Sequence, residues 1–318
     1  MTLKIFISST GFSPFSKGGS RGIFSLLRIY KISPNPSLKK RGIVLFGFAL
    51  LGVMISACTA FCAPPVRIVS LAPSVTEILF DLALGDRIAA VTDFCDYPGE
   101  AKRKPKIGGF ANPSLEAIVA IRPDLVIMTE EGNPVEVYRR LKKLGIKTYV
   151  FRAKRLGDLP QGIRDLGGVL GIADVADRRA SDVEKQLAGL AKKAKFFQPG
   201  RKAIKALFVI HPEPLLVAGR ETVIDDALTL LGLNNIAADA GTKYPKYTIE
   251  EIVRRSPDVI FIGQGPMSAN LSKSLMKRLE TLEAVRKGRV YYVSELLYRL
   301  TPRTILGIEE ISEHLKGT

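Results

Sequence analysis

The feature of this sequence that most constrains its fold is an internal repeat. Residues 114–127 and residues 248–261 follow the same order, 134 positions apart. Each copy begins with a hydroxyl residue suited to capping a helix (Ser114 or Thr248), continues with an apolar residue, a glutamate and Ile-Val, and ends with Pro-Asp and a β-rich run. Any helix-to-strand unit with a proline stop shares part of this pattern, but here cap, carboxylate, breaker and strand all keep their spacing. The chain is therefore predicted to contain two related halves.

Each half alternates β-rich runs with helical stretches. The first half predicts strands at 67–71, 124–128 and 146–151, a helix opening at a Ser74–Glu77 capping box, and a helix at 134–144 closed by Gly145. The second half predicts strands at 203–210, 257–262 and 289–293 and helices at 221–231 and 302–315. Alternating elements of this kind form parallel sheets covered by helices. The predicted fold class is α/β, with two similar lobes whose mostly parallel sheets are flanked by helices.

A long stretch without proline separates the two halves. Residues 174–197 are rich in Ala, Leu, Lys, Glu and Gln, which favour a helix, and the next proline is Pro199. Because one helix joining two lobes makes the pair stiff, we expect only small lobe motion on ligand binding. The predicted boundaries are 66–170 for the N-terminal lobe, 171–199 for the connecting helix and 200–318 for the C-terminal lobe.

The N-terminal region has the features of an export signal. Residues 1–62 hold eight basic residues and no acidic ones, and a basic cluster at 39–41 precedes the apolar run 42–57. This run is short for a membrane-spanning helix and small residues follow it, as in a cleavable signal peptide; a retained anchor is the alternative. Residues 39–62 are predicted to be a signal peptide. Residues 1–38 lack a periodic apolar pattern and are predicted to be a non-native or disordered extension.

Cleavage of this signal could follow two routes. Residues 55–58 resemble a lipoprotein processing site, at which Cys58 would carry the lipid, whereas an ordinary signal peptidase could cut near Ala60 or Ala63. The predicted location is the periplasm or the outer face of a membrane, with lipid anchoring through Cys58 left open. A soluble mature chain that keeps only the Cys95 thiol cannot form an internal disulfide, so its fold must depend on its core.

Composition and motifs argue against catalysis and nucleic-acid binding. The net charge is +16, but half of it lies in residues 1–62, and the rest is scattered without a nucleic-acid motif. The chain has two histidines (His211 and His314), no phosphate loop, no nucleophile elbow and no zinc pattern. We predict that it is not an enzyme and has no catalytic cofactor and no metal, although dispersed carboxylates could still form an acid–base pair.

Four segments together resemble a known family. They are Ser70–Glu77, Cys95–Pro98, Ser114–Val126 and Arg299–Arg303. From residue 67 to the C-terminus the chain resembles the periplasmic cobalamin-binding proteins of ABC importers, within a larger class that also carries ferric siderophores and haem. The Asp-Tyr-Pro sequence inside the second segment favours the cobalamin branch. The resemblance implies a class III periplasmic binding protein, in which one long rigid helix joins two lobes and the ligand lies in the cleft between them.

The resemblance also implies ligand-binding residues. Tyr97 would pack on the corrin, and Phe110 and Tyr244 precede the two repeat helices at places where the family often uses Trp. Glu295 and Arg299 lie where the family uses an acidic residue and an arginine to contact corrin amides. This chain has no Trp, and Glu295 is longer than the usual Asp, so these departures concern the ligand's identity more than the class. The alternatives are ordinary packing for the aromatic residues and an ion pair between Arg299 and Glu295.

Glu116 and Glu250 occupy matching places in the first turns of the two repeat helices. In the family that the chain resembles, one carboxylate on each lobe docks into an arginine pocket of the permease dimer. A pseudo-twofold protein suits a twofold partner. The alternative role for both glutamates is a favourable interaction with the helix dipole.

These arguments predict an extracytoplasmic, monomeric substrate-binding protein. It would capture cobalamin (vitamin B12) or a related corrinoid and deliver it to the transmembrane dimer of an ABC import permease, with no nucleic-acid partner. A ferric-siderophore or haem binder is the alternative within this class. A periplasmic enzyme and a surface interaction module are the alternatives outside it.

Overall fold

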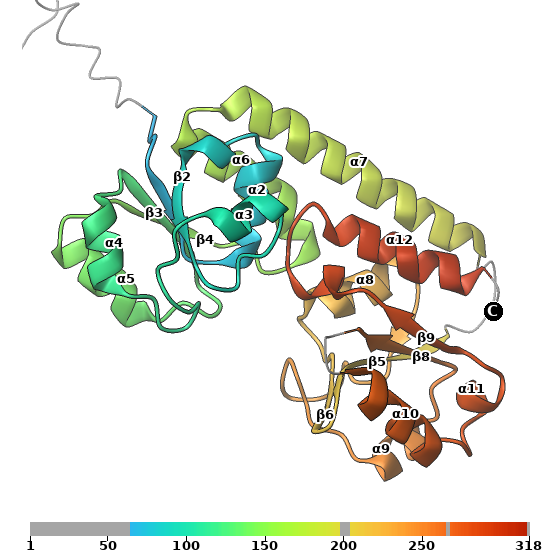
Figure 1. Ribbon diagram of the computed structural model, residues 1–318. Helices are drawn as coiled ribbons and strands as arrows, with labels where there is room; N and C mark the ends of the chain where they lie inside the picture. The colour runs from blue at the N-terminus through green and yellow to red at the C-terminus, as the bar shows by residue number, and fades with distance from the viewer. Residues whose placement is uncertain (1–63, 198–203, 265–267, 317–318) are drawn as a thin grey trace, which may run out of the picture. The chain divides into compact units, whose positions relative to one another are not determined.

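The computed structural model describes residues 64–197, 204–264 and 268–316 (Figure 1). These residues belong to one compact unit, 62–318. The predicted extension 1–38, the predicted signal peptide 39–62 and the possible lipidation site Cys58 lie outside the described residues.

The first lobe is built on a four-stranded parallel sheet. Its strand order is β2-β1-β3-β4, made of β1 (Ile68–Ser70), β2 (Ile88–Val91), β3 (Leu125–Thr129) and β4 (Thr148–Phe151). The helices of this lobe are α2 (Pro73–Asp81), α3 (Gly99–Arg103), α4 (Leu115–Ile121), α5 (Val135–Lys143) and α6 (Leu159–Leu170), with short 3-10 turns η1 (Gly85–Arg87) and η2 (Leu156–Asp158). One face of the sheet packs on α4 and α5, and the other packs on α2 and α6. Both faces are therefore covered, as a parallel sheet requires.

The second lobe repeats this order with one addition. The strands β5 (Lys205–Pro212), β8 (Val259–Gly263) and β9 (Val290–Val293) are parallel neighbours, and the short β7 (Asn234–Asn235) pairs with the start of β5. The added strand β6 (Leu215–Val217) runs antiparallel to the end of β5. The helices are α8 (Val223–Leu230), α9 (Ile249–Arg255), α10 (Ser268–Arg278), α11 (Glu283–Arg286) and α12 (Thr304–Leu315), and the 3-10 turn η3 (Glu295–Tyr298) follows β9.

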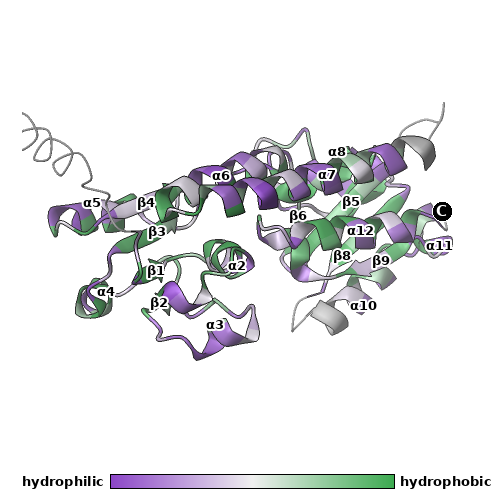
Figure 2. Cartoon of the chain, turned by 90° about the horizontal axis from the view of Figure 1, so that it is seen from above, coloured by the Kyte–Doolittle hydropathy of each residue, from purple (hydrophilic) through white to green (hydrophobic). Residues whose placement is uncertain are grey.

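One long helix, α7 (Ala173–Phe197), serves both lobes. It packs against α6 of the first lobe and against α8 and α12 of the second. Its buried residues, such as Val183 and Leu190, belong to a single apolar cluster that contains residues of both sheets. In Figure 2 the strands are largely hydrophobic, whereas α7 carries many hydrophilic residues along its length. The predicted class is confirmed: two α/β lobes are joined by one long helix.

The repeat seen in the sequence extends to individual hydrogen bonds. The Oγ of Ser114 accepts a bond from the Ala117 N–H at 3.2 Å, and the Oγ1 of Thr248 accepts one from the Glu251 N–H at 3.2 Å. Both caps were predicted. Each helix ends in a left-handed residue, Arg122 with φ 51° and Ser256 with φ 47°.

The aspartates of the two Pro-Asp pairs also have the same role. Asp124 accepts a hydrogen bond from the Arg67 N–H at 2.9 Å, and Asp258 accepts one from the Lys205 N–H at 2.8 Å. Each aspartate thereby ties the start of its own strand to the start of the neighbouring strand. The match between the two halves is therefore a duplication of geometry as well as of sequence.

One local prediction is wrong. Helix α2 begins at Pro73, after Ala72, and Ser74 is not its cap. Proline at the first helical position presets the backbone angle and lacks only an N–H that would have no partner there. Glu77 therefore does not form the predicted capping box, and its side chain binds residues of the second lobe instead.

We expect the Thr248→Ala substitution to lower the free energy of unfolding by about 1 kcal/mol, because the first turn of α9 loses its side-chain acceptor. Urea unfolding followed by circular dichroism measures the change. Thr248→Ser keeps the hydroxyl and is the matched control. Equal stability of the alanine and serine variants would contradict the assigned cap.

Candidate functional site

A cavity of about 410 Å³ is lined by residues of both lobes. Five aromatic side chains dominate its walls: Phe94, Phe110 and Phe151 from the first lobe, and Tyr244 and Tyr298 from the second. Charged side chains also line it, among them Glu130, Glu131, Lys154, Glu221, Lys243 and Arg299. Apolar walls with a few charged groups suit a ligand that has a flat apolar body and a polar rim.

A second cavity of about 440 Å³ adjoins the first. Tyr298 and Arg299 line both cavities and so form the partition between them. Charged side chains make up a larger share of the residues that line the second cavity, because Glu77, Asp96, Glu295 and Arg303 line it together with Arg299. The cleft thus has an aromatic compartment and an ionic compartment that meet at two residues.

The predicted ligand-binding residues all line this cleft. Phe110, Tyr244 and Arg299 line the aromatic compartment, and Tyr97, Glu295 and Arg299 line the ionic one. Tyr97 and Tyr244 are 43% and 55% exposed, so neither is an ordinary core residue. Their assignment as ligand contacts stays a prediction.

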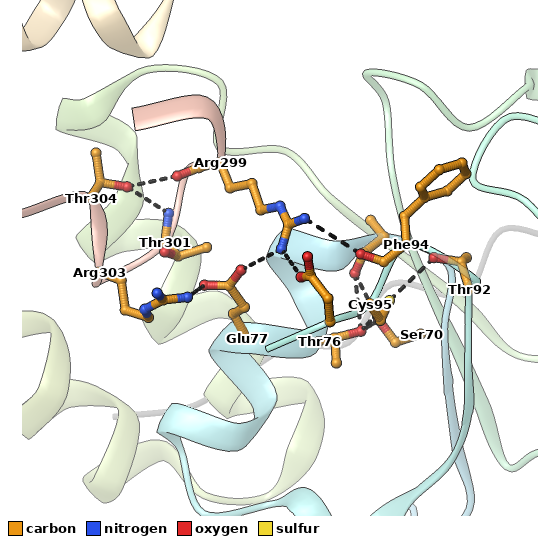
Figure 3. Close-up of polar contacts among 12 residues, drawn as sticks. Ser70, Thr76, Glu77, Thr92, Phe94, Cys95, Arg299, Thr301, Arg303 and Thr304 are labelled. Carbon is orange, nitrogen blue, oxygen red and sulfur yellow. Dashed lines mark hydrogen bonds and ion pairs between the residues drawn. The ribbon is translucent and has the colours of Figure 1, made fainter. Parts of the chain in front are cut away.

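Arg299 is held by the opposite lobe (Figure 3). Its Nη1 donates to Glu77 Oε1 at 2.9 Å and to Asp96 Oδ1 at 2.5 Å, and its Nη2 donates to the Phe94 carbonyl at 3.4 Å. The alternative pairing of Arg299 with Glu295 is wrong, because its ion-pair partners are Glu77 and Asp96. Burial opposes the charge of Arg299, but these hydrogen bonds outweigh it and raise the pKa of the guanidinium.

Glu77 is the centre of this cluster. Its side chain is only 4% exposed, and its second oxygen, Oε2, accepts a hydrogen bond from Arg303 Nη1 at 3.1 Å. The guanidinium of Arg303 also lies over the Tyr97 ring, 3.3 Å from its centroid. One buried carboxylate of the first lobe therefore meets two arginines of the second.

Phe110 is positioned by its backbone and by a glycine. The Asn133 side-chain amide donates to the Phe110 carbonyl at 2.8 Å and to the Leu71 carbonyl at 2.9 Å. Gly132 has φ +97°, and a Cβ there would lie 1.9 Å from the Phe110 ring. Glycine at 132 is thus needed both for its backbone angle and for the close approach of the ring.

Two further ion pairs join the lobes. Arg155, after β4, pairs with Asp226 of α8, and the Leu156 N–H also donates to Asp226 at 2.8 Å. Lys243 of the second lobe pairs with Glu131 of the first, and both line the aromatic compartment. The Arg155–Asp226 pair lies outside both compartments.

The Cys95 thiol is buried beneath the loop that carries Asp96 and Tyr97. Its Sγ lies 3.1 Å from Thr76 Oγ1 and 3.2 Å from Thr92 Oγ1. These contacts attach the loop to α2 next to Glu77. Cys95 is therefore a buried packing residue next to the segment that lines the ionic compartment.

Glu116 and Glu250 lie outside both compartments, exposed in the first turns of α4 and α9. Two hydrogen bonds to the Glu250 carboxylate, one from its own backbone N–H and one from the Thr248 hydroxyl, lower the pKa of Glu250. The neighbourhoods of the two glutamates differ. On α9, Glu251 pairs with Arg254 and Arg255, whereas α4 has Ala117, Ala120 and Ile121 at the matching positions.

Several residues of the cleft were missed by sequence reasoning. Phe94 and Tyr298 each directly precede a segment that carries the resemblance. This position in the sequence was the available sign that they line the cleft. Glu77 and Arg303 lie inside such segments, but Glu77 was interpreted as a helix cap. The Glu131–Lys243 pair joins residues 112 positions apart and has no local signature.

Comparison with known proteins places the chain in a family. Residues 68–296 match the periplasmic binding protein family, so the chain belongs to it. Its relatives include the vitamin B12-binding protein of Vibrio parahaemolyticus, 30% identical over 84% of this chain and 95% of the relative. The solved periplasmic vitamin B12 binding protein BtuF of Vibrio cholerae is 28% identical, with a TM-score of 0.70, over 80% of this chain and 97% of that one. A periplasmic heme binding protein from Pseudomonas aeruginosa is 27% identical, with a TM-score of 0.72, over 80% and 94%.

The family and these relatives are binding proteins rather than enzymes. Within residues 64–197, 204–264 and 268–316, no helix combines the length and apolar character needed to cross a bilayer. The same residues contain no group of three or more histidine, cysteine or acidic side chains placed to hold a metal ion.

The Asp96–Arg299 pair makes a testable contribution to stability. The hydrogen bond from Arg299 lowers the pKa of Asp96 below 3.8 in the folded state. Its contribution is therefore fully present above the ordinary carboxyl pKa and is lost as pH falls through the lowered value. We expect Asp96→Asn to be less stable than the wild type at pH 7, with the difference shrinking below about pH 4. Urea midpoints measured from pH 7 to pH 2 test this, and a constant difference would contradict it.

Proposed function

We propose that this protein is an extracytoplasmic substrate-binding protein that captures cobalamin (vitamin B12) or a related corrinoid and delivers it to an ABC import permease. The observation that carries the proposal is the cleft, whose aromatic walls come from both lobes and whose ionic compartment supplies charged hydrogen-bonding groups. The names of the relatives supply the ligand class. The proposal includes export by the signal at 39–62, anchoring through Cys58 as an option, action as a monomer and no catalytic activity.

A large ligand would need both compartments of the cleft. Binding pockets usually measure about 300–1,000 Å³, and each compartment taken alone lies near the lower end of that range. A corrinoid is a large, flat ligand and needs more room than one compartment offers. The two compartments meet at Tyr298 and Arg299, so movement of these side chains would join them into one site.

A haem or ferric siderophore is the second candidate ligand. The heme binding protein from Pseudomonas aeruginosa resembles this chain about as closely as BtuF does. Haem is also flat and apolar with a charged rim, so the aromatic compartment suits it equally. The ligand must therefore be decided by experiment.

Side-by-side titration of the purified protein with cyanocobalamin, haem and a ferric siderophore decides between these ligands. We expect cyanocobalamin to quench tyrosine fluorescence and to bind most tightly. Phe110→Ala and Tyr244→Ala should each raise its Kd about tenfold, because each removes an aromatic wall. Tyr292→Ala is the matched control, since this exposed tyrosine of β9 lines neither compartment. Tighter binding of haem or the siderophore would overturn the cobalamin proposal.

The docking proposal concerns Glu116 and Glu250. Their matching positions on α4 and α9 and their exposure support contact with a twofold permease. Reversing both charges (Glu116→Lys with Glu250→Lys) should abolish uptake in transport assays and leave the Kd for the ligand unchanged. The control reverses Glu136 and Glu283, exposed first-turn glutamates of α5 and α11. If the Kd rose as much as uptake fell, the two glutamates would belong to the ligand site instead.

A further inference from the structure

The two arginines on Glu77 have unequal access to the cleft. Arg299 binds Glu77 Oε1 and Arg303 binds Oε2 (Figure 3). Arg299 lines both compartments, whereas Arg303 lines only the ionic one. Arg303 has no part in the aromatic compartment. A ligand that occupies the aromatic compartment, alone or together with the ionic one, would therefore reach Arg299 there and not Arg303.

Glu77 limits how freely Arg299 can respond to a ligand. Its carboxylate is 4% exposed, and a buried carboxylate that loses its only cation is strongly destabilising. If Glu77 had Arg299 as its sole partner, turning Arg299 toward a ligand would leave a buried uncompensated charge. Arg303 removes this obstacle because it binds the other oxygen of the same carboxylate.

We propose that Arg303 is a positioning residue for ligand binding: it holds the charge of Glu77 so that Arg299 can leave the carboxylate and bind polar groups of the ligand. The stacking of Arg303 on the Tyr97 ring holds the Arg303 guanidinium beside Glu77. The inference rests on the proposed function, because it needs a ligand that recruits Arg299. It adds a role for Arg303 and Glu77 that the ligand contacts alone do not require.

The test measures the Kd for cyanocobalamin in three variants. Arg303→Gln should raise the Kd about tenfold, because Glu77 then depends on Arg299 and resists its release. In the Glu77→Gln background no buried charge needs a partner. Adding Arg303→Gln to Glu77→Gln should therefore change the Kd less than about threefold, whereas a direct ligand contact by Arg303 would give the same loss in both backgrounds.

A matched control separates this role from a general effect on the lobes. Arg155→Gln also removes a guanidinium that pairs across the lobes, but Arg155 and its partner Asp226 line neither compartment. It should change the Kd less than twofold. The inference is overturned if Arg303→Gln binds like the wild type, if its loss persists in the Glu77→Gln background, or if Arg155→Gln weakens binding as much.

A second readout needs no ligand. Arg299→Gln and Arg303→Gln should each lower Tm modestly, because one cation remains on Glu77. The double variant should lower Tm by clearly more than the two losses added together, and Glu77→Gln should suppress that excess. Strictly additive losses would overturn the shared role of the two arginines.

The two readouts also separate the inference from the proposed function. If the wild type binds haem or the siderophore in place of cyanocobalamin, the cobalamin proposal fails, and the same variants titrated with the ligand that binds decide the inference. If the wild type binds none of the three, the release of Arg299 fails together with the proposed function. The Tm series still reports whether both arginines neutralise Glu77.

Discussion

The interaction on which the arrangement of the two lobes depends is a buried carboxylate of one lobe that binds two arginines of the other. Glu77 sits on α2, directly after the first strand, and both of its oxygens are bonded to residues more than 200 positions away. Removing such a carboxylate from water is unfavourable unless the partners are present and correctly placed. The two lobes are therefore joined by the ion pairs of Glu77 as well as by α7. These ion pairs help to set the positions of the cleft walls.

The duplicated architecture gives each lobe the same means of reaching the other. In the first lobe, the segment after β4 supplies Arg155 to a carboxylate of α8, and in the second, the segment after β9 supplies Arg299 to a carboxylate of α2. In each case a carboxylate on the first helix of one lobe pairs with an arginine that follows the last strand of the other lobe. The aromatic residues are also distributed between the lobes, so that neither half alone forms the cleft.

Sequence reasoning succeeded where the determinants are local. The caps Ser114 and Thr248, the long helix and the alternation of strands and helices follow from neighbouring residues, and the structure has them. It failed for Glu77, where a local rule predicted a cap but a partner 222 positions away takes the side chain. Pairings of this kind depend on how the sheets bring distant segments together, and no spacing in a single sequence reveals them.

The unequal surroundings of the two repeat glutamates have a consequence for any symmetrical partner. Beside Glu116, α4 carries the apolar side chains of Ala117, Ala120 and Ile121, while α9 beside Glu250 carries a cluster of guanidinium and carboxylate groups. A partner with two identical halves could accept the protein in either of two orientations related by a half-turn. Because the two helices differ, each half of the partner would contact a different surface. Docking of this protein would therefore make an otherwise symmetrical assembly asymmetric.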